Sequence, residues 1–155
     1  MATPEKEALA LGRQVIEGLE RKDAAIVNAV LREDVVLHVP FPLVAGENMV
    51  GTRRQVGDAV RRYLDESNQL TETVRFDNKV WRTTDDGLAM FQADGEVMLR
   101  DGRPYLNHYL FLFEAQGGKI TQCAHGESFY AKHYQAGNKH AFVINPNKAA
   151  VLKKP

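Results

Sequence analysis

The sequence contains a single cysteine, Cys123, and no apolar run near the ~18–20 residues that a membrane-spanning helix requires. One cysteine cannot form an internal disulfide, and it excludes zinc sites built from several cysteines. The N-terminus also lacks the apolar core of a secretory signal peptide. These absences predict a protein of a reducing compartment, and we expect a cytoplasmic location.

The chain has no excess of charge of either sign, since 20 Lys and Arg residues balance 20 Asp and Glu residues. Proteins that wrap nucleic acid or lie on a membrane surface carry a basic excess. We therefore expect neither nucleic acid nor a membrane as a partner.

Several catalytic signatures are also missing. The sequence has no G-x-S-x-G nucleophile motif, no Walker loop and no G-x-G-x-x-G dinucleotide loop. None of the five histidines has the i, i+4 spacing of a helical metal site. Hydrolases with a serine nucleophile, nucleotide-binding enzymes and metalloenzymes are accordingly disfavoured, and we expect no metal.

The 155 residues, of which 44% are hydrophobic, suit one domain with one core. We expect this domain to span residues 1–134 and a basic tail to span residues 135–155. From Lys132 onward the chain has five lysines and no acidic residue. This segment is either a solvated tail or an arm that packs on a partner subunit through residues 142–144.

The first 70 residues have helical spacing interrupted by one strand. Thr3-Pro4 is a helix start, and Asp23 can cap a short second helix that ends at Leu31. Residues 35–39 are β-branched and predict a strand. Thr52 and Gln55 match a capping box, so the stripe that follows them predicts a third helix: Val56, Ala59, Val60, Tyr63 and Leu64.

From residue 71 the apolar period changes to two, which predicts four strands at about 71–83, 88–100, 104–115 and 119–131. The breaks between them are Asp and Gly pairs typical of hairpins. Such short connections require antiparallel neighbours. We therefore expect an α+β fold, with three helices on one face of a curved antiparallel sheet and the strand near residue 37 at an edge.

The candidate chemistry lies on the last two of these strands. His125 and Glu127 are two residues apart on one strand, so both belong to the same face. A histidine beside a carboxylate can act as a general base or acid. Asn107 and Tyr109 could donate hydrogen bonds to a developing oxyanion. The alternative is that His125 and Glu127 form an exposed pair near a strand end.

The remaining polar and aromatic residues favour structural roles. His38 is more typical of a core or pocket rim than of a catalytic site, and His108 lies on the opposite face from Asn107 and Tyr109. Asp94 and Glu96 either line a cavity or face solvent, and we favour exposure to solvent for both. Trp81 predicts core packing or an aromatic wall. Cys123 has no basic neighbours and is expected to be a buried apolar residue.

The order helix–helix–strand–helix–four strands resembles the nuclear transport factor 2-like superfamily over about residues 5–134. Within it, the chain is similar to the branch of ketosteroid-isomerase-like and SnoaL-like polyketide cyclase proteins. The run Asn107-His108-Tyr109 and the turn Gly117-Gly118-Lys119-Ile120 carry this resemblance. The stretch Gln92-Ala93-Asp94-Gly95 is more like the phenazine-biosynthesis members.

The resemblance implies a conical, barrel-like curved sheet wrapped around three N-terminal helices, as in the cystatin-like and nuclear transport factor 2-like folds. It also implies which face lines the pocket. Many enzymes of the family carry a pocket carboxylate five residues beyond the isoleucine of Gly-Lys-Ile, and here that position is His125. SnoaL-like cyclases often have a histidine where this chain has Phe111. The resemblance further implies a homodimer formed through the sheet.

We therefore expect an isomerase, dehydratase or cyclase that acts on a small apolar carbonyl compound of secondary metabolism, polyketide-like or steroid-like. His125 would move the proton, Glu127 would orient or charge it, and Asn107 with Tyr109 would polarise the carbonyl. An apolar cavity would be shaped by Phe111, Phe113, His38 and Trp81. Proton transfer beside a carbonyl requires no cofactor. The alternatives are a non-catalytic binding or accessory protein with the same cavity, and an adaptor for other proteins.

Overall fold

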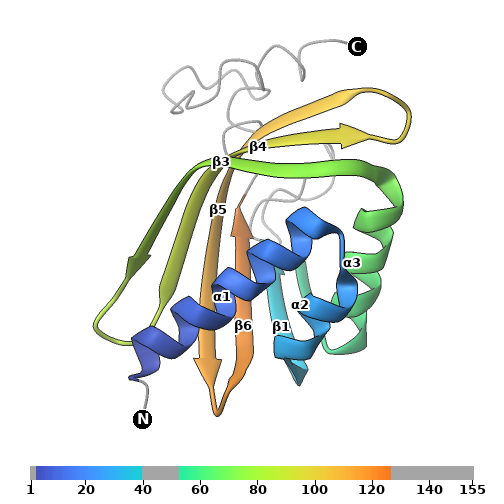
Figure 1. Cartoon of the computed structure of the whole chain (residues 1–155). Helices are drawn as coiled ribbons and strands as arrows, with labels where there is room; N and C mark the ends of the chain where they lie inside the picture. The colour runs from blue at the N-terminus through green and yellow to red at the C-terminus, as the bar shows by residue number, and fades with distance from the viewer. Residues whose placement is uncertain (1–2, 40–52, 127–155) are drawn as a thin grey trace.

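The computed structural model of the chain describes residues 3–39 and 53–126 (Figure 1). In this part the helices are α1 (Pro4–Arg21), α2 (Ala24–Val30) and α3 (Asp58–Leu70). The strands are β1 (Leu31–Val39), β2 (Arg53–Val56), β3 (Thr71–Thr83), β4 (Ala89–Leu99), β5 (Pro104–Gln116) and β6 (Lys119–Gly126). This arrangement confirms the α+β fold.

The strands form one curved sheet in the order β2-β1-β6-β5-β4-β3. Strands β3 to β6 are consecutive antiparallel neighbours, as their short turns predict. The glycines of these turns adopt positive φ angles, for example 92° at Gly87 and 86° at Gly102. The sheet does not close into a barrel, because within the described residues β2 and β3 each have only one neighbour.

The predicted position of the first strand was wrong in two respects. Strand β1 begins at Leu31, where the second helix was expected to end, and it lies inside the sheet rather than at its edge. It runs parallel to β6, with Leu37 opposite Cys123, and antiparallel to β2. The short strand β2 was not predicted, and it takes the edge position instead.

The predicted start of the third helix was also wrong. Gln55 of the proposed capping box lies within β2, where it pairs with Leu37, and Thr52 lies outside the described residues. The helix begins only after Gly57, whose φ of 58° turns the chain and whose N–H donates a 2.8 Å hydrogen bond to Val35 O. Val56 belongs to the edge strand and is 44% exposed, so the apolar stripe of α3 begins at Ala59 and Val60.

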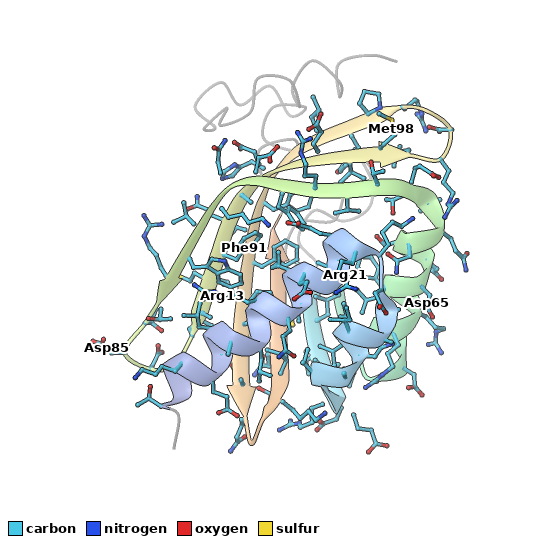
Figure 2. The ribbon with its side chains drawn as sticks, in the orientation of Figure 1. Arg13, Arg21, Asp65, Asp85, Phe91 and Met98 are labelled. Atoms are coloured by element: carbon cyan, nitrogen blue, oxygen red, sulfur yellow. The ribbon has the colours of Figure 1, made fainter. Side chains whose placement is uncertain are left out.

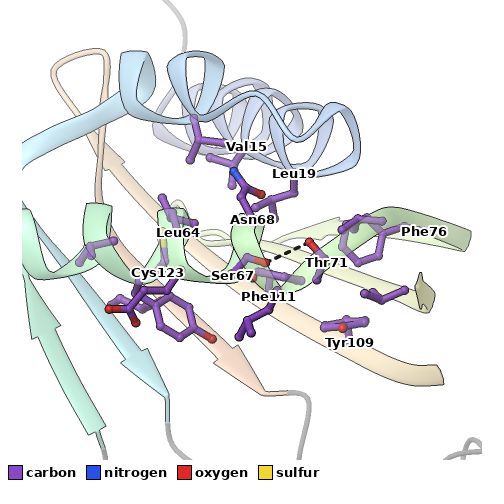
Figure 3. Close-up of a pocket in the computed structure, with 18 of the residues that line it drawn as sticks. Val15, Leu19, Leu64, Ser67, Asn68, Thr71, Phe76, Tyr109, Phe111 and Cys123 are labelled. Atoms are coloured by element: carbon purple, nitrogen blue, oxygen red, sulfur yellow. Dashed lines mark hydrogen bonds between the residues drawn. The ribbon is translucent and has the colours of Figure 1, made fainter. Parts of the chain in front are cut away.

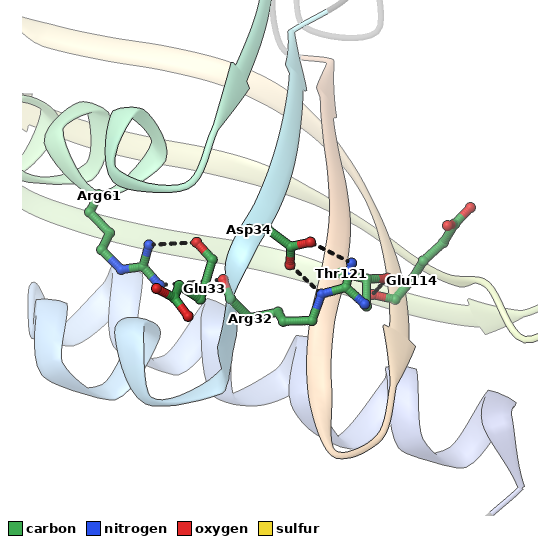
Figure 4. Close-up of polar contacts among 6 residues, drawn as sticks. All are labelled: Arg32, Glu33, Asp34, Arg61, Glu114 and Thr121. Atoms are coloured by element: carbon green, nitrogen blue, oxygen red, sulfur yellow. Dashed lines mark hydrogen bonds and ion pairs between the residues drawn. The ribbon is translucent and has the colours of Figure 1, made fainter.

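Polar contacts fix α3 against β1 (Figure 4). The Arg61 guanidinium donates hydrogen bonds of 3.3 Å to the carbonyl oxygens of Glu33 and Arg32. The Arg32 side chain pairs with Asp34 on the same strand. The Arg61 contacts hold the N-terminal turn of α3 beside the start of β1, and the rest of the helix extends over the inner face of the sheet.

Helix α1 crosses the inner face of the sheet and packs closely on β5 at Gly12 (Figures 1 and 2). A Cβ atom at Gly12 would lie 2.9 Å from Phe113 Cδ2, so only glycine lets the helix pack this tightly on β5. Arg13 lies over the Trp81 ring at 5.9 Å from its centroid. The core beneath contains the fully buried side chains of Phe91, Phe113, Ile120 and Val35. In the described residues, no helix is long and apolar enough to span a membrane.

Candidate functional site

A cavity of about 420 Å³ lies between the inner face of the sheet and the three helices (Figure 3). This volume falls in the range of pockets that bind small molecules, roughly 300–1,000 Å³. All three helices and the strands β1, β3, β4, β5 and β6 contribute lining side chains. The fold thus forms a partly open chamber of suitable size for a ligand of a few rings.

The sheet side of the cavity is aromatic. Strand β5 contributes Tyr109, Phe111 and Phe113 at alternate positions. The Tyr109 and Phe111 rings are 5.8 Å apart and 20° from parallel, and the Phe111 and Phe113 rings are 6.0 Å apart and 4° from parallel. Phe76 of β3 meets Tyr109 edge to face at 5.2 Å. These rings form a rigid wall, because each is held by its neighbours.

The helix side of the cavity is aliphatic, and the polar side chains gather at one end. Val15 and Leu19 of α1 and Leu64 of α3 supply apolar surface. The last turn of α3 supplies Glu66, Ser67 and Asn68, and the adjoining start of β3 supplies a threonine. The hydroxyl of Thr71 donates a 3.0 Å hydrogen bond to the carbonyl of Ser67 (Figure 3). The cavity is therefore apolar along its length and polar beside the C-terminal end of α3.

Cys123 also lines the cavity. Burial raises the pKa of its thiol to about 12, because a buried thiolate would lose its hydration. The thiol is therefore neutral at physiological pH and is a poor nucleophile. This finding agrees with the expectation that Cys123 acts as a small apolar residue.

The structure places some of the predicted site residues directly. Tyr109, Phe111 and Phe113 line the cavity. Trp81 is not among the lining residues. It packs in the core against Phe91 at 4.7 Å and Phe113 at 6.1 Å. Trp81 lies opposite Phe91 in the β3–β4 register, and Arg13 of α1 lies over its ring. Trp81 therefore packs under α1 rather than beside the cavity.

Four other predicted residues are located by backbone alone or lie outside the described residues. His125 lies on β6 opposite Phe111, and Asn107 lies on β5 opposite Gly95. His38 lies on β1 between Ala124 of β6 and Arg54 of β2. Glu127 and the tail at residues 135–155 lie outside the described residues.

A separate polar network lies on the outer face of the sheet. The His108 Nδ1 atom is 2.9 Å from Asp94 Oδ1, and the Asn78 amide donates a 2.8 Å hydrogen bond to Asp94 Oδ2. The hydrogen bonds from Asn78 and from His108 hold the pKa of the Asp94 carboxyl below its usual range. Asp94 and Glu96 therefore lie away from the cavity, as predicted, and Glu96 pairs with Arg75.

The polar end of the cavity was missed at the sequence level. The apolar stripe of α3 runs through Val60 and Leu64, so continuing it by four residues reaches Asn68. A polar residue at the next position of a helix stripe that faces the core could have indicated this site. The signal is weak, because the same spacing also occurs where a helix ends in solvent.

The sequence matches the SnoaL-like domain family over residues 13–123. This chain belongs to the SnoaL-like domain family. The match begins within α1 and ends within β6, and it contains the whole of α2, α3 and strands β1 to β5. No curated protein matches the sequence of this SnoaL-like domain.

Solved structures with the nuclear transport factor 2-like fold superimpose on this SnoaL-like domain. A candidate isomerase from Bacillus subtilis has a TM-score of 0.71 at 15% identity, over 90% of this chain and 99% of its own. A candidate polyketide cyclase from Xanthomonas campestris has a TM-score of 0.62 at 19% identity, over 86% and 98%. An LEH-like epoxide hydrolase from M. tuberculosis has a TM-score of 0.60 at 18% identity, over 83% and 87%. At these identities the likeness establishes the shared fold alone.

Proposed function

We propose that this SnoaL-like domain is a small-molecule isomerase, dehydratase or cyclase that acts by general acid–base chemistry on an apolar carbonyl compound. The observation that carries the proposal is the apolar cavity of about 420 Å³ under the helices. Membership of the SnoaL-like family supports it, since proteins of the same fold include a candidate isomerase and a candidate cyclase. A polyketide-like or steroid-like compound of secondary metabolism would suit such a chamber.

In the proposed reaction His125 is the residue that moves the proton. Its register partner Phe111 lines the cavity, and so does Cys123, two residues earlier on the same strand. His125 would take a proton from the carbon beside the carbonyl group, and the electron pair of the broken C–H bond would move to the carbonyl oxygen. The proton would then return at another atom of the same compound. Glu127 would orient the imidazole, while Tyr109 and Asn107 would hydrogen-bond to the enolate oxygen.

The experiment uses 2-tetralone and its saturated analogue 2-decalone as probes. Exchange of their α-protons for deuterium is followed by NMR with and without the protein. We expect His125→Gln to lower the catalysed exchange rate about 10²–10⁴-fold, since a positioned acid or base contributes that factor. The affinity of the probes should change little, because the ring contacts remain.

The matched control is His108→Gln, which removes a histidine from the outer face of the sheet. It should leave the exchange rate unchanged. Equal losses in the two variants would contradict a catalytic role for His125. Tight binding without exchange above the buffer rate would instead support the alternative, a non-catalytic binding or accessory protein that uses the same cavity.

We also propose that two copies of the domain pair through the outer face of the sheet. Apolar side chains emerge on that face, among them Leu110 at 36% exposure and Val80 at 39%. Leu110→Glu should convert the dimer to a monomer in analytical ultracentrifugation. Gln69→Glu, on the exposed side of α3, should leave the mass unchanged, and a monomeric parent protein would overturn the proposal.

A further inference from the structure

The cavity has an uneven distribution of polar groups. Its sheet wall consists of aromatic rings, and its helix wall is mainly aliphatic. Polar side chains concentrate beside the last turn of α3, where Figure 3 shows Asn68 extending from the helix toward Leu19 of α1. A ligand in this chamber would thus meet apolar surface along most of its length and, at one end, the polar side chains of Glu66, Ser67, Asn68 and Thr71.

Asn68 occupies a position that normally holds an apolar side chain. Val60, Leu64 and Asn68 follow one another at four-residue spacing on α3, which places them on the same face of the helix. All three line the cavity. Val60 and Leu64 present hydrocarbon to the cavity, whereas Asn68 presents an amide with two donor hydrogens and one acceptor oxygen.

The Asn68 carboxamide has no hydrogen-bonding partner among the residues that the structure describes. Its neighbour at the same end behaves differently, because the Thr71 hydroxyl bonds to the carbonyl of Ser67. Asn68 is partly exposed, and its amide atoms are not among the buried polar atoms that lack a partner, so both water and a ligand can reach them. On a stripe whose other members are apolar, this amide gives the cavity a group that can exchange bound water for the oxygen of a ligand.

We propose that Asn68 binds the oxygen of an aromatic hydroxyl or carbonyl compound whose rings pack on Tyr109, Phe111 and Phe113. The amide hydrogens can donate to a carbonyl oxygen, and the amide oxygen can accept from a hydroxyl group. Aromatic pairs gain stability beyond their buried area in edge-to-face or offset contact, so the sheet wall favours aromatic over saturated rings. The inference rests on the proposed function only in taking this cavity as the ligand site.

Three probes of similar shape test the two contacts separately. 2-Naphthol has both rings and oxygen, naphthalene lacks the oxygen, and decahydro-2-naphthol lacks the aromatic rings. Their dissociation constants are measured by NMR titration. We expect 2-naphthol to bind more tightly than either of the other two, because only it satisfies the amide and the aromatic wall together.

The decisive variant is Asn68→Leu. We expect it to weaken 2-naphthol about fivefold to tenfold, the worth of one hydrogen bond near the upper end of its usual range. Naphthalene should bind the variant as well as before or more tightly. Gln69→Leu is the matched control, since it removes a carboxamide from the next, exposed position and should leave both constants unchanged. Equal losses for both probes, or no loss for 2-naphthol, would overturn the inference.

A second measurement needs no variant and covers the case in which Asn68→Leu does not fold. The side-chain amide resonances of Asn68 in the parent protein should shift on titration with 2-naphthol and stay in place with naphthalene. Shifts of equal size with both probes would exclude a specific hydrogen bond. The result is independent of catalysis: loss of proton exchange would defeat the proposed function and leave this binding contact standing, and the converse also holds.

Discussion

Replacing Phe113 with alanine is expected to lower the free energy of unfolding by about 3–5 kcal/mol, the range for a large aromatic side chain removed from a packed core. Phe113 is fully buried and lies beneath Gly12 of α1. Its ring is also within 6.1 Å of Trp81 and 6.0 Å of Phe111, measured between centroids. The gap cannot be filled by collapse, because rigid rings and a helix surround it. Chemical denaturation with urea measures the change.

The control for this substitution is Leu70→Ala, at the C-terminal end of α3. Leu70 is 68% exposed, so its truncation should change the unfolding free energy by less than about 0.5 kcal/mol. A small effect at Phe113 would show that α1 can move down onto the sheet. That outcome would contradict the close packing seen at Gly12.

The substitution Gly95→Ala is expected to destabilise the protein by about 1–3 kcal/mol, as overpacking of a filled core does. Gly95 lies on β4, and a Cβ atom there would overlap the Tyr109 ring. The ring cannot simply withdraw, since it packs against Phe76 at 5.2 Å and Phe111 at 5.8 Å. Tyr109 must therefore shift within the cavity wall, and we expect aromatic probes to bind less tightly as well.

A double-mutant cycle separates this contact from the general effect of alanine in a strand. In a Tyr109→Ala background the Gly95→Ala substitution meets no ring and should be neutral or stabilising, because alanine loses less backbone entropy than glycine. The unfolding free energies of the four proteins give the coupling. Equal effects in both backgrounds would show that Gly95 is needed for the strand itself and not for Tyr109.

The antiparallel part of the sheet was predictable because its signals are local. Each pair of strands from β3 to β6 is joined by a turn containing glycine at positive φ, and the apolar period of two continues on both sides. The predicted strand boundaries accordingly agree within one residue, except that the predicted end of the last strand, at residue 131, lies outside the described residues. The inner and outer faces also follow from alternation once one residue, such as the fully buried Phe113, is assigned to the core.

The edge strand β2 and its pairing with β1 were not predictable in the same way. Arg53–Val56 has no strand pattern of its own, and its conformation depends on pairing with β1, including Val56 with Val36. A capping-box match at Thr52 and Gln55 is a local signal that this tertiary pairing overrides. Only the positive φ at Gly57 marks the true beginning of α3, and a lone glycine does not reveal its φ from sequence.

The candidate site was only partly within reach of the sequence. Alternation along β5 identifies Tyr109, Phe111 and Phe113 as a group, and all three line the cavity. Two features of the site cannot be inferred from residue order, because both depend on how strands and helices pack. One is the Tyr109 ring in the space above Gly95, and the other is the position of Asn68 in the cavity lining. Trp81 fits the core alternative, because it packs against Phe91 and Phe113 and is not among the residues that line the cavity.

The place of β6 in the sheet affects the order in which the protein can assemble during synthesis. β6 is the last described strand along the chain, yet it lies between β1 and β5. Before Lys119 leaves the ribosome, β2 and β1 have no strand that joins them to β5, β4 and β3. Pairing Leu31 with Ile120 closes a very long loop, and contacts of that kind slow folding. A nascent chain stopped before β6 would therefore expose two unpaired strand edges, which are sites for aggregation and for chaperone binding.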